Sequence, residues 1–213
     1  TGGQGDLRAL RDWVVTLNDS QQYAVAVSCV RDASYTNNIQ EVFDCLSGAQ
    51  FHFARSAASF AGIRNAYYEP QRLGVDRWLA LLAIKARGEN SAVIIDVGTA
   101  CTIDVLQNDQ HLGGYILPGM ALARDALTTN TEKIRFSRDP EPSISLGSDT
   151  ASCVSSGIWL TLLASCQSVI DRFPDVKVYL TGGSAPELAA LGLSAQRVDS
   201  LVFDGLDFWL NGA

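Results

Sequence analysis

The chain lacks several motifs that common enzyme classes require. Its five cysteines form no C-x-x-C, so a zinc knuckle and a thioredoxin-like dithiol are excluded. Neither G-x-G-x-x-G nor G-x-x-x-x-G-K-[ST] occurs, which removes the Rossmann and Walker phosphate loops. No serine lies in a G-x-S-x-G elbow, so a serine hydrolase is disfavoured. The two histidines, His52 and His111, are far apart and have no third partner in a metal spacing, so we expect no metal role for them.

Basic residues are also scarce. The 213 residues include 16 Lys and Arg against 23 Asp and Glu, which gives a net charge of −7. A duplex-binding protein needs a basic footprint, and no block of like charge occurs, so we expect no nucleic-acid partner. A local site for a phosphate-bearing substrate is still compatible with this charge.

Long apolar runs are absent as well. A membrane helix needs roughly 18–20 apolar residues, and the nearest run, 154–163, is interrupted by a Ser-Ser-Gly triplet. We therefore expect no membrane association. No basic-then-apolar leader opens the chain, so we expect no signal peptide. The odd number of widely spaced cysteines predicts reduced, mostly buried thiols in a cytoplasmic protein.

The remaining pattern is that of a mixed α/β protein with a hydrophobic fraction of 47%. Periodicity predicts helices over 6–17, 35–46, 76–87, 120–129, 150–172, 184–191 and 204–210. It predicts strands over 24–30, 50–54, 92–95, 101–106, 112–116, 176–180 and 198–203. Residues 59–70 and 138–148 are expected to be loops. The turn at 88–90 is the expected boundary between domains 1–88 and 89–213, and the strands within 92–116 should form a meander.

One candidate site lies where the strand at 92–95 ends. Asp96 follows this apolar strand, and Gly98 and Thr99 form the next turn. Such a turn can bind a phosphate on its backbone amides and a cation on its carboxylate. A plain hairpin with Asp and Gly as turn formers explains the same residues, and spacing alone favours it.

A second candidate is Asp76, at the start of the helix 76–87. A carboxylate there serves as an N-cap in many proteins, but it could also take a proton from a substrate hydroxyl as a general base. Arg77 would then be an anion ligand rather than a surface charge. Both interpretations remain open on the pattern alone.

Glycine-rich segments supply weaker candidates. In 181–187, Ser184 and Glu187 fit a capping box, while Gly182 and Gly183 would let a nucleotide approach the strand–helix junction. In 113–119, paired glycines within a strand indicate a bulge or a close approach by another group. Thr150 is expected to cap its helix.

Four segments taken together resemble type III pantothenate kinase: NAYYEPQRLGVDRW, IIDVGTACTIDV, HLGGYILPGM and YLTGG, in that order. The resemblance implies two ribonuclease-H-like α/β halves of the actin, heat-shock-70 and sugar-kinase superfamily, with a central cleft. It implies ATP-dependent phosphorylation of pantothenate to 4′-phosphopantothenate, the first step of coenzyme A synthesis. Mg²⁺ would accompany ATP, and the family is typically a homodimer with the pantothenate site close to the interface.

Site residues follow from the same resemblance. Asp76 matches the proton acceptor, and Asp96 matches the ligand of an activating K⁺ or NH₄⁺ ion. The pantothenate site would include Tyr67, Gly74, Val75, Asp76, Arg77 and Thr150. The ATP site would include Gly98, Thr99, Gly182 and Gly183.

The chain departs from the family at its start. The family opens with a strand and an Asp-x-Gly-Asn-Thr/Ser phosphate loop, which residues 1–6 do not match. We therefore expect the first half to lack its N-terminal strands. A non-enzymatic regulator of the same fold, or a kinase for another small hydroxylated acceptor, are the alternatives. The segment LGVDRW favours pantothenate.

Overall fold

The computed structural model describes residues 7–17, 21–29, 33–46, 48–131, 134 and 140–212. The helices are α1 (Leu7–Val14), α2 (Ala33–Val42), η1 (Pro70–Arg72), α3 (Val75–Ala86), α4 (Met120–Asn130), α5 (Thr150–Ile170), α6 (Ala185–Ala190) and α7 (Leu201–Asn211). The strands are β1 (Tyr23–Val27), β2 (Ala49–Phe53), β3 (Ser59–Phe60), β4 (Ile63–Arg64), β5 (Ala92–Val97), β6 (Ala100–Gln107), β7 (Gln110–Pro118), β8 (Lys177–Thr181) and β9 (Gln196–Arg197).

A seven-stranded sheet forms the centre of the molecule, in the order β3-β4-β7-β6-β5-β8-β9. β5, β6 and β7 are the predicted meander, which is confirmed by their antiparallel pairing. β8 pairs in parallel with β5, and β9 pairs in parallel with β8. A three-stranded meander extended by parallel strands is the ribonuclease-H-like arrangement, so the expected fold class is confirmed for this part.

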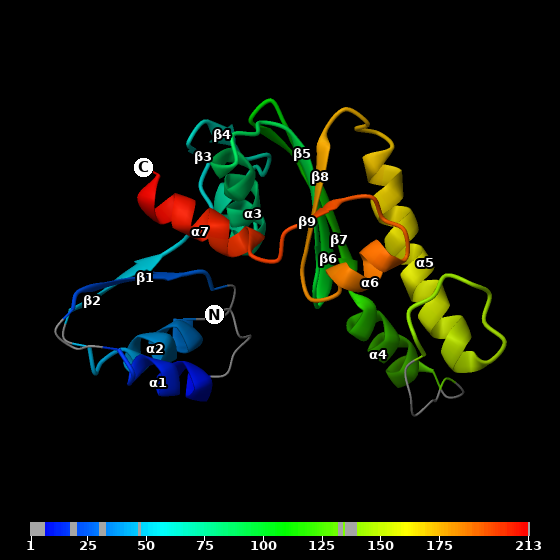
Figure 1. The fold of residues 1–213 in the computed structure, drawn as a ribbon, viewed down its shortest axis with the longest axis horizontal. Coiled ribbons are helices and arrows are strands. Elements are labelled where there is room, and N and C mark those ends of the chain that lie inside the picture. Colours follow the sequence, from blue (N-terminus) through cyan, green and yellow to red (C-terminus); the bar gives the residue numbers. More distant parts are fainter. Residues whose placement is uncertain are drawn as a thin grey trace.

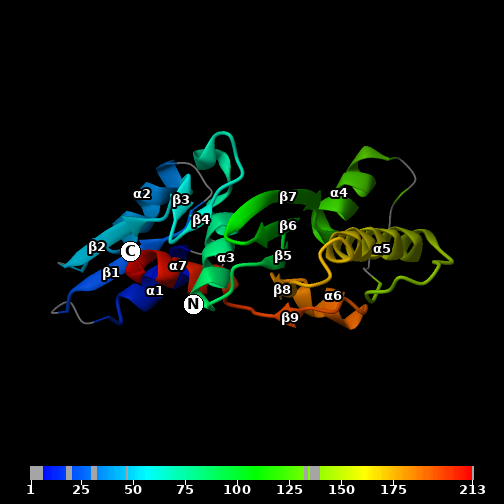
Figure 2. The same cartoon turned by 90° about the horizontal axis from the view of Figure 1, so that it is seen from above.

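Helices cover both faces of this sheet (Figures 1 and 2). α3 and α7 lie on one face, and α5 and α6 lie on the other. β5 is buried between them because its side chains alternate: Ala92 and Ile94 join the α3 core, while Val93 and Ile95 join the α5 core. The end of β5 is therefore held on two sides.

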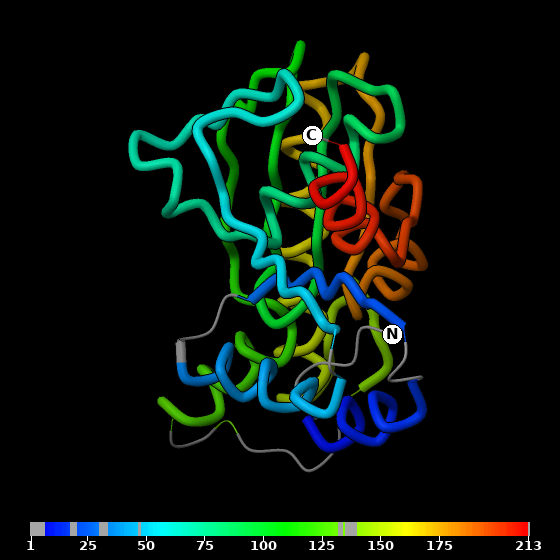
Figure 3. Tube along the Cα trace, turned by 90° about the vertical axis from the view of Figure 1, so that its left-hand side faces the viewer, coloured from blue at the N-terminus to red at the C-terminus, as the bar shows by residue number. Residues whose placement is uncertain are grey.

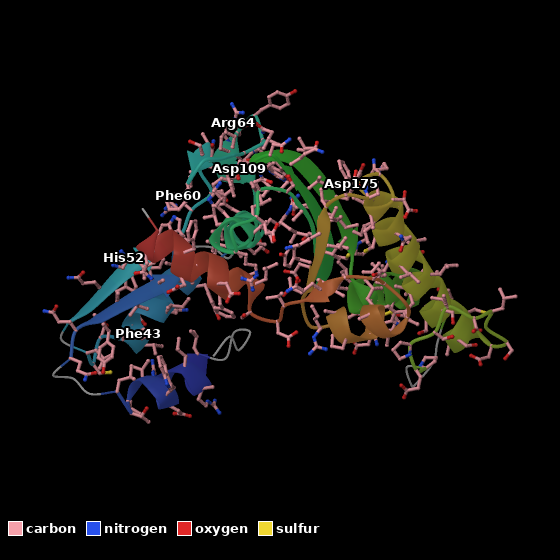
Figure 4. All side chains as sticks on the ribbon, turned by 45° about the horizontal axis from the view of Figure 1, so that its top comes forward. Phe43, His52, Phe60, Arg64, Asp109 and Asp175 are labelled. Carbon is pink, nitrogen blue, oxygen red and sulfur yellow. The ribbon has the colours of Figure 1, made fainter. Side chains whose placement is uncertain are left out.

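A smaller unit lies at one end of the molecule. β1 and β2 pair in parallel as a separate sheet, and α1 and α2 cover it with their own apolar cluster around Val14 and Phe43. Figure 3 shows α1 and α2 together at the bottom of the molecule, away from α7. In Figure 4, Phe43 belongs to this unit, whereas Phe60 contacts Phe208 of α7 with ring centroids 6.3 Å apart.

Two predicted segments differ in the structure. The strand expected over 198–203 was wrong: β9 ends at Arg197 and α7 already begins at Leu201. Leu201 and Leu206 are buried against α3, so tertiary packing decided the helix. The loop expected over 59–70 contains β3, β4 and the start of η1. Residues 1–6 and part of the 138–148 loop lie outside the described residues.

α5 ends two residues before the predicted bound, but it is more apolar than the sequence analysis allowed. By length and composition it could cross a membrane, a test that the core helices of many proteins also pass. Trp159, Leu162 and Cys166 on this helix are buried against the sheet. The cysteines are free thiols as expected, but only Cys101 and Cys166 are buried, so the expectation of mostly buried thiols was wrong.

Candidate active site

The first part of the site is the N-terminus of α3. Gly74 is the N-cap, so Asp76 does not cap this helix and lies in its first turn. Asp76 Oδ1 accepts the backbone N–H of Arg77 at 2.8 Å. A Cβ on Gly74 would lie only 2.6 Å from this oxygen, so glycine leaves the room that the carboxylate occupies. Val75 is buried beneath the turn.

The second part is the end of β5. Asp96 pairs with Thr102 on one side and with Thr181 on the other. Gly182 follows with φ +97°, and a Cβ on it would lie 2.4 Å from Asp96 Oδ1. Only glycine therefore allows the 181–183 turn to close against this carboxylate.

The same turn is fixed to β5 from the side of α6. Ser184 N–H donates to Val97 O at 2.9 Å. The predicted capping box was wrong, because the Ser184 side chain makes no capping hydrogen bond. Gly183 is exposed and has open space where a Cβ would project.

Asp76 and Asp96 interact although they come from different elements. Burial raises the pKa of Asp96 to about 6, and the negative charge of Asp76 contributes to this rise. The two carboxylates therefore lie close enough to repel each other, and a cation near them would be favourable. In the described ranges, no group of three or more His, Cys, Asp or Glu side chains could hold a metal ion. The carboxylates suit a cation with mainly non-protein oxygen ligands.

The β5–β6 turn is held from two sides. Gly98 N–H donates to Ala100 O at 2.9 Å, and Gly119 N–H donates to Thr99 O at 3.0 Å. A Cβ on Gly119 would lie 2.2 Å from Gly98 O. The turn is thus a rigid hairpin, and Thr99 at its tip is exposed.

Arg77 points into the protein and is 6% exposed. Its Nε and Nη2 donate to the two oxygens of Asp104 at 2.8 and 2.6 Å, and its Nη1 donates to the Tyr67 hydroxyl at 2.8 Å. Burial lowers the pKa of the guanidinium, but the hydrogen bonds and charge of Asp104 outweigh this effect and raise it. The group predicted as an anion ligand thus already has a carboxylate partner.

Asp104 and His111 were missed as members of the site. His111 is fully buried and its Nε2 lies 2.9 Å from Asp104 Oδ1. The sequence did hold a signal, because a carboxylate within an apolar strand needs a buried partner. The paired glycines opposite were a second signal: a Cβ on Gly114 would lie 2.6 Å from Asp104 Oδ1.

Thr150 lies elsewhere. It is the first residue of α5, and the N-cap is Asp149, which forms a capping box with Ser152, so the predicted cap was wrong. The N-terminal end of α5 lies at one end of the molecule, across the sheet from α3, in both Figure 1 and Figure 2. Within one chain the structure brings Asp76 and Asp96 together but leaves Thr150 apart from them.

Comparisons with known proteins identify a single family. The family model described as type III pantothenate kinase matches residues 3–172. A type III pantothenate kinase of Acinetobacter baumannii is 39% identical over 167 residues, covering 78% of this chain and 67% of the relative. One of Ectopseudomonas mendocina is 38% identical over 190 residues, covering 83% of this chain and 75% of the relative.

A solved structure supports the fold. It is a conserved Campylobacter jejuni protein described as a Baf family transcriptional activator, with a TM-score of 0.60 and 22% identity. The match covers 95% of this chain and 88% of that one. This match shows the fold, and the sequence matches show the family: the chain belongs to the type III pantothenate kinase family.

Proposed function

We propose that this protein transfers the γ-phosphoryl group of ATP to the primary hydroxyl of pantothenate, giving 4′-phosphopantothenate for coenzyme A synthesis. The observation that carries the proposal is the charge interaction between Asp76 and Asp96. It occurs beside the closely packed glycine turns at 97–100 and 181–183, in a chain of this family. Phosphoryl transfer depends mainly on positioning and charge neutralisation, and this arrangement can provide both. We place the reaction in the cytoplasm.

Asp76 is assigned as the general base. Its Oδ1 is occupied by the Arg77 N–H, so Oδ2 is the atom assigned to the proton of the substrate hydroxyl. The carboxylate lies in the first turn of α3, at the positive end of the helix dipole.

Asp96 is assigned as the protein ligand of a monovalent cation, K⁺ or NH₄⁺. Burial and, to a smaller extent, repulsion from Asp76 raise the Asp96 pKa, and a cation beside Asp96 would offset both effects. Mg²⁺ would arrive with ATP, because it is commonly held by phosphates and few carboxylates. Its contribution would be to neutralise charge on the phosphates.

The ATP phosphates are assigned to the two turns around Asp96. Gly98 and Thr99 offer one turn, and Gly182 and Gly183 offer the other. Backbone amides in such turns bind anions without a basic side chain, which fits the acidic composition of the chain.

Pantothenate is assigned to the N-terminus of α3, beside Tyr67, Gly74, Val75 and Arg77. The site combines a half-buried aromatic hydroxyl with apolar surface. This suits a substrate with a carboxylate at one end and a diol at the other.

The protein is proposed to act as a homodimer, because the α4–α5 face exposes apolar side chains that a second copy could bury. No residue of α4 is buried, although Leu122 and Leu127 on this helix are large and apolar. An apolar cavity of about 390 Å³ lies between α4, α5 and the end of β7. Because α5 begins far from α3 within one chain, we assign Thr150 to the pantothenate site of the other subunit.

The test is a coupled assay of ADP release with ATP and pantothenate, in K⁺ and in Na⁺. We expect turnover that requires pantothenate and is faster in K⁺. Turnover with another hydroxylated acceptor but not with pantothenate would contradict the proposed substrate. A stable dimer without any phosphoryl transfer would favour the regulator alternative.

A further inference from the structure

A buried hydrogen-bond network lies behind the proposed base and joins α3 to two strands. Arg77 comes from α3, Asp104 from β6 and His111 from β7, and the side chains of these three residues are 6%, 3% and 0% exposed. Tyr67, in the segment before η1, completes the network and is half-buried. It is therefore the member that reaches toward solvent.

The Asp104 carboxylate accepts from three donors. Two come from the guanidinium of Arg77 and one from the ring of His111. Ala66 N–H points to His111 Nδ1 at 3.5 Å, so Nδ1 is the accepting nitrogen and Nε2 carries the proton given to Asp104. With a neutral imidazole, the ionic charges of the network sum to zero.

The network leaves one donor unused at its outer end. The Tyr67 oxygen accepts from Arg77 Nη1, so the hydroxyl proton must point to another acceptor. Among the described residues the structure offers none for this proton. A hydroxyl polarised by a neighbouring guanidinium is a stronger hydrogen-bond donor than an isolated phenol.

Several contacts fix the Tyr67 ring in place. It stacks on His111, with centroids 6.4 Å apart and an interplanar angle of 14°. Its backbone N–H donates to Asn65 Oδ1 at 3.0 Å. His111 therefore supports Tyr67 directly through the ring and indirectly through Asp104 and Arg77.

The backbone of β7 is shaped to make room for the ion pair. A Cβ on Gly114 would lie 2.6 Å from Asp104 Oδ1 and 2.8 Å from Arg77 Nη2. The register shift between Val105 and Leu106 opposite this segment lets His111 face Leu106. A glycine beside a β-bulge allows the side chains of Asp104 and Arg77 to pack closely against the β7 backbone.

We propose that Asp104 and His111 are positioning residues for the acceptor substrate: they hold Arg77 so that it directs the Tyr67 hydroxyl proton toward a substrate oxygen. This rests on the proposed function, because the acceptor is the substrate assigned to this end of α3. Arg77 then acts through Tyr67, and its positive charge is already balanced by Asp104. Recognition of the acceptor oxygen depends on one directed donor rather than on net charge.

The test compares Asp104→Asn, Tyr67→Phe and the double variant in steady-state assays with pantothenate and ATP. Each single substitution should raise the KM for pantothenate by about 10-fold, the effect of losing one well-directed hydrogen bond. The KM for ATP and kcat should change less than about 2-fold. Both substitutions abolish the same directed hydrogen bond, one by removing the hydroxyl and the other by releasing Arg77. The KM of the double variant should therefore be no higher than that of the worse single variant.

Asp204→Asn is the matched control. Asp204 pairs with Arg87 at 2.7 Å, so this variant also breaks an Arg–Asp pair at α3 but far along the helix. It should leave both KM values unchanged. His111→Gln and His111→Phe form a second pair: glutamine retains a donor for Asp104, whereas phenylalanine retains only the ring. We expect the glutamine variant to recover most of the pantothenate affinity that the phenylalanine variant loses.

The outcomes separate the two proposals. A wild-type protein that neither phosphorylates pantothenate nor binds it in calorimetry overturns the proposed function, and this inference with it. If the wild-type protein phosphorylates pantothenate but the KM increases of Asp104→Asn and Tyr67→Phe multiply in the double variant, the positioning role alone is overturned. Equal losses in the glutamine and phenylalanine variants of His111 also overturn it. If Asp104→Asn does not fold, the His111 pair decides.

Discussion

Replacing Asp96 by asparagine should stabilise the ligand-free protein while removing its function. In the folded state the Asp96 pKa rises from 3.8 to about 6, first by burial and then by the charge of Asp76. The folded state therefore retains this proton at pH values where the unfolded chain has already released it. Stability falls as pH rises through this interval, and the full cost is present above pH 6.

The magnitude follows from the two values. The difference between 3.8 and about 6 corresponds to at most about 3 kcal/mol at pH 7.5, where both states are ionised. At pH 5 only about half of this cost is present, because the folded state is still mostly protonated. An asparagine side chain carries no charge at either pH, so Asp96→Asn should gain about 1–3 kcal/mol at pH 7.5 and less at pH 5.

The assay is urea unfolding of the two proteins at both pH values, without K⁺ and nucleotide. Asp175→Asn is the control, since Asp175 is exposed at the surface (Figure 4) and should give no such difference. An Asp96→Asn protein that is no more stable than the wild type at pH 7.5 would refute the reasoning. So would a gain that does not grow between pH 5 and pH 7.5.

Three further predictions concern the base, the ion pair and the dimer. Asp76→Asn should lower kcat by about 10²–10⁴-fold in the ADP-release assay with little change in the unfolding midpoint, and intact turnover would remove Asp76 as the base. Gly114→Ala should cost about 3 kcal/mol or more in urea unfolding, because the added Cβ would lie 2.2 Å from Ile103 O. Gly157→Ala on α5, where nothing lies within 4 Å, should be neutral or stabilising; equal losses would show that steric contact is not the cause. Leu122→Asp should shift the protein from dimer to monomer in light scattering after gel filtration, and an unchanged mass would move the interface away from α4.

Much of the fold was predictable because its signals are local. β5 is a continuous apolar run, and α3 has an apolar stripe, so both are predicted within one or two residues of their observed bounds. Asp96 was also predictable, since it ends an apolar strand before a glycine turn. These features depend on neighbours in the sequence, which periodicity and turn chemistry describe well.

The features that the sequence did not predict depend on residues far apart in the chain. The segment 198–203 is rich in β-formers, yet it starts a helix because Leu201 and Leu206 find their partners on α3. Likewise the partner of Arg77 could not be predicted from neighbouring residues, because Arg77 lies on α3, whereas Asp104 lies on β6 and His111 on β7. A single sequence shows that a buried carboxylate needs a partner but does not say which residue provides it.

The packing of α7 on α3 also constrains how the protein reaches its native state. Gly205 sits so close to Leu79 that a Cβ would lie 1.9 Å from the Leu79 carbonyl oxygen. Strands β5 to β9 all lie between the two helices in sequence, so this contact closes a very long loop. During synthesis the apolar side of α3 remains without its cover until α7 has left the ribosome. The core beside the helix that carries Asp76 is therefore completed only after α7 is made, and an unfinished chain exposes this apolar surface.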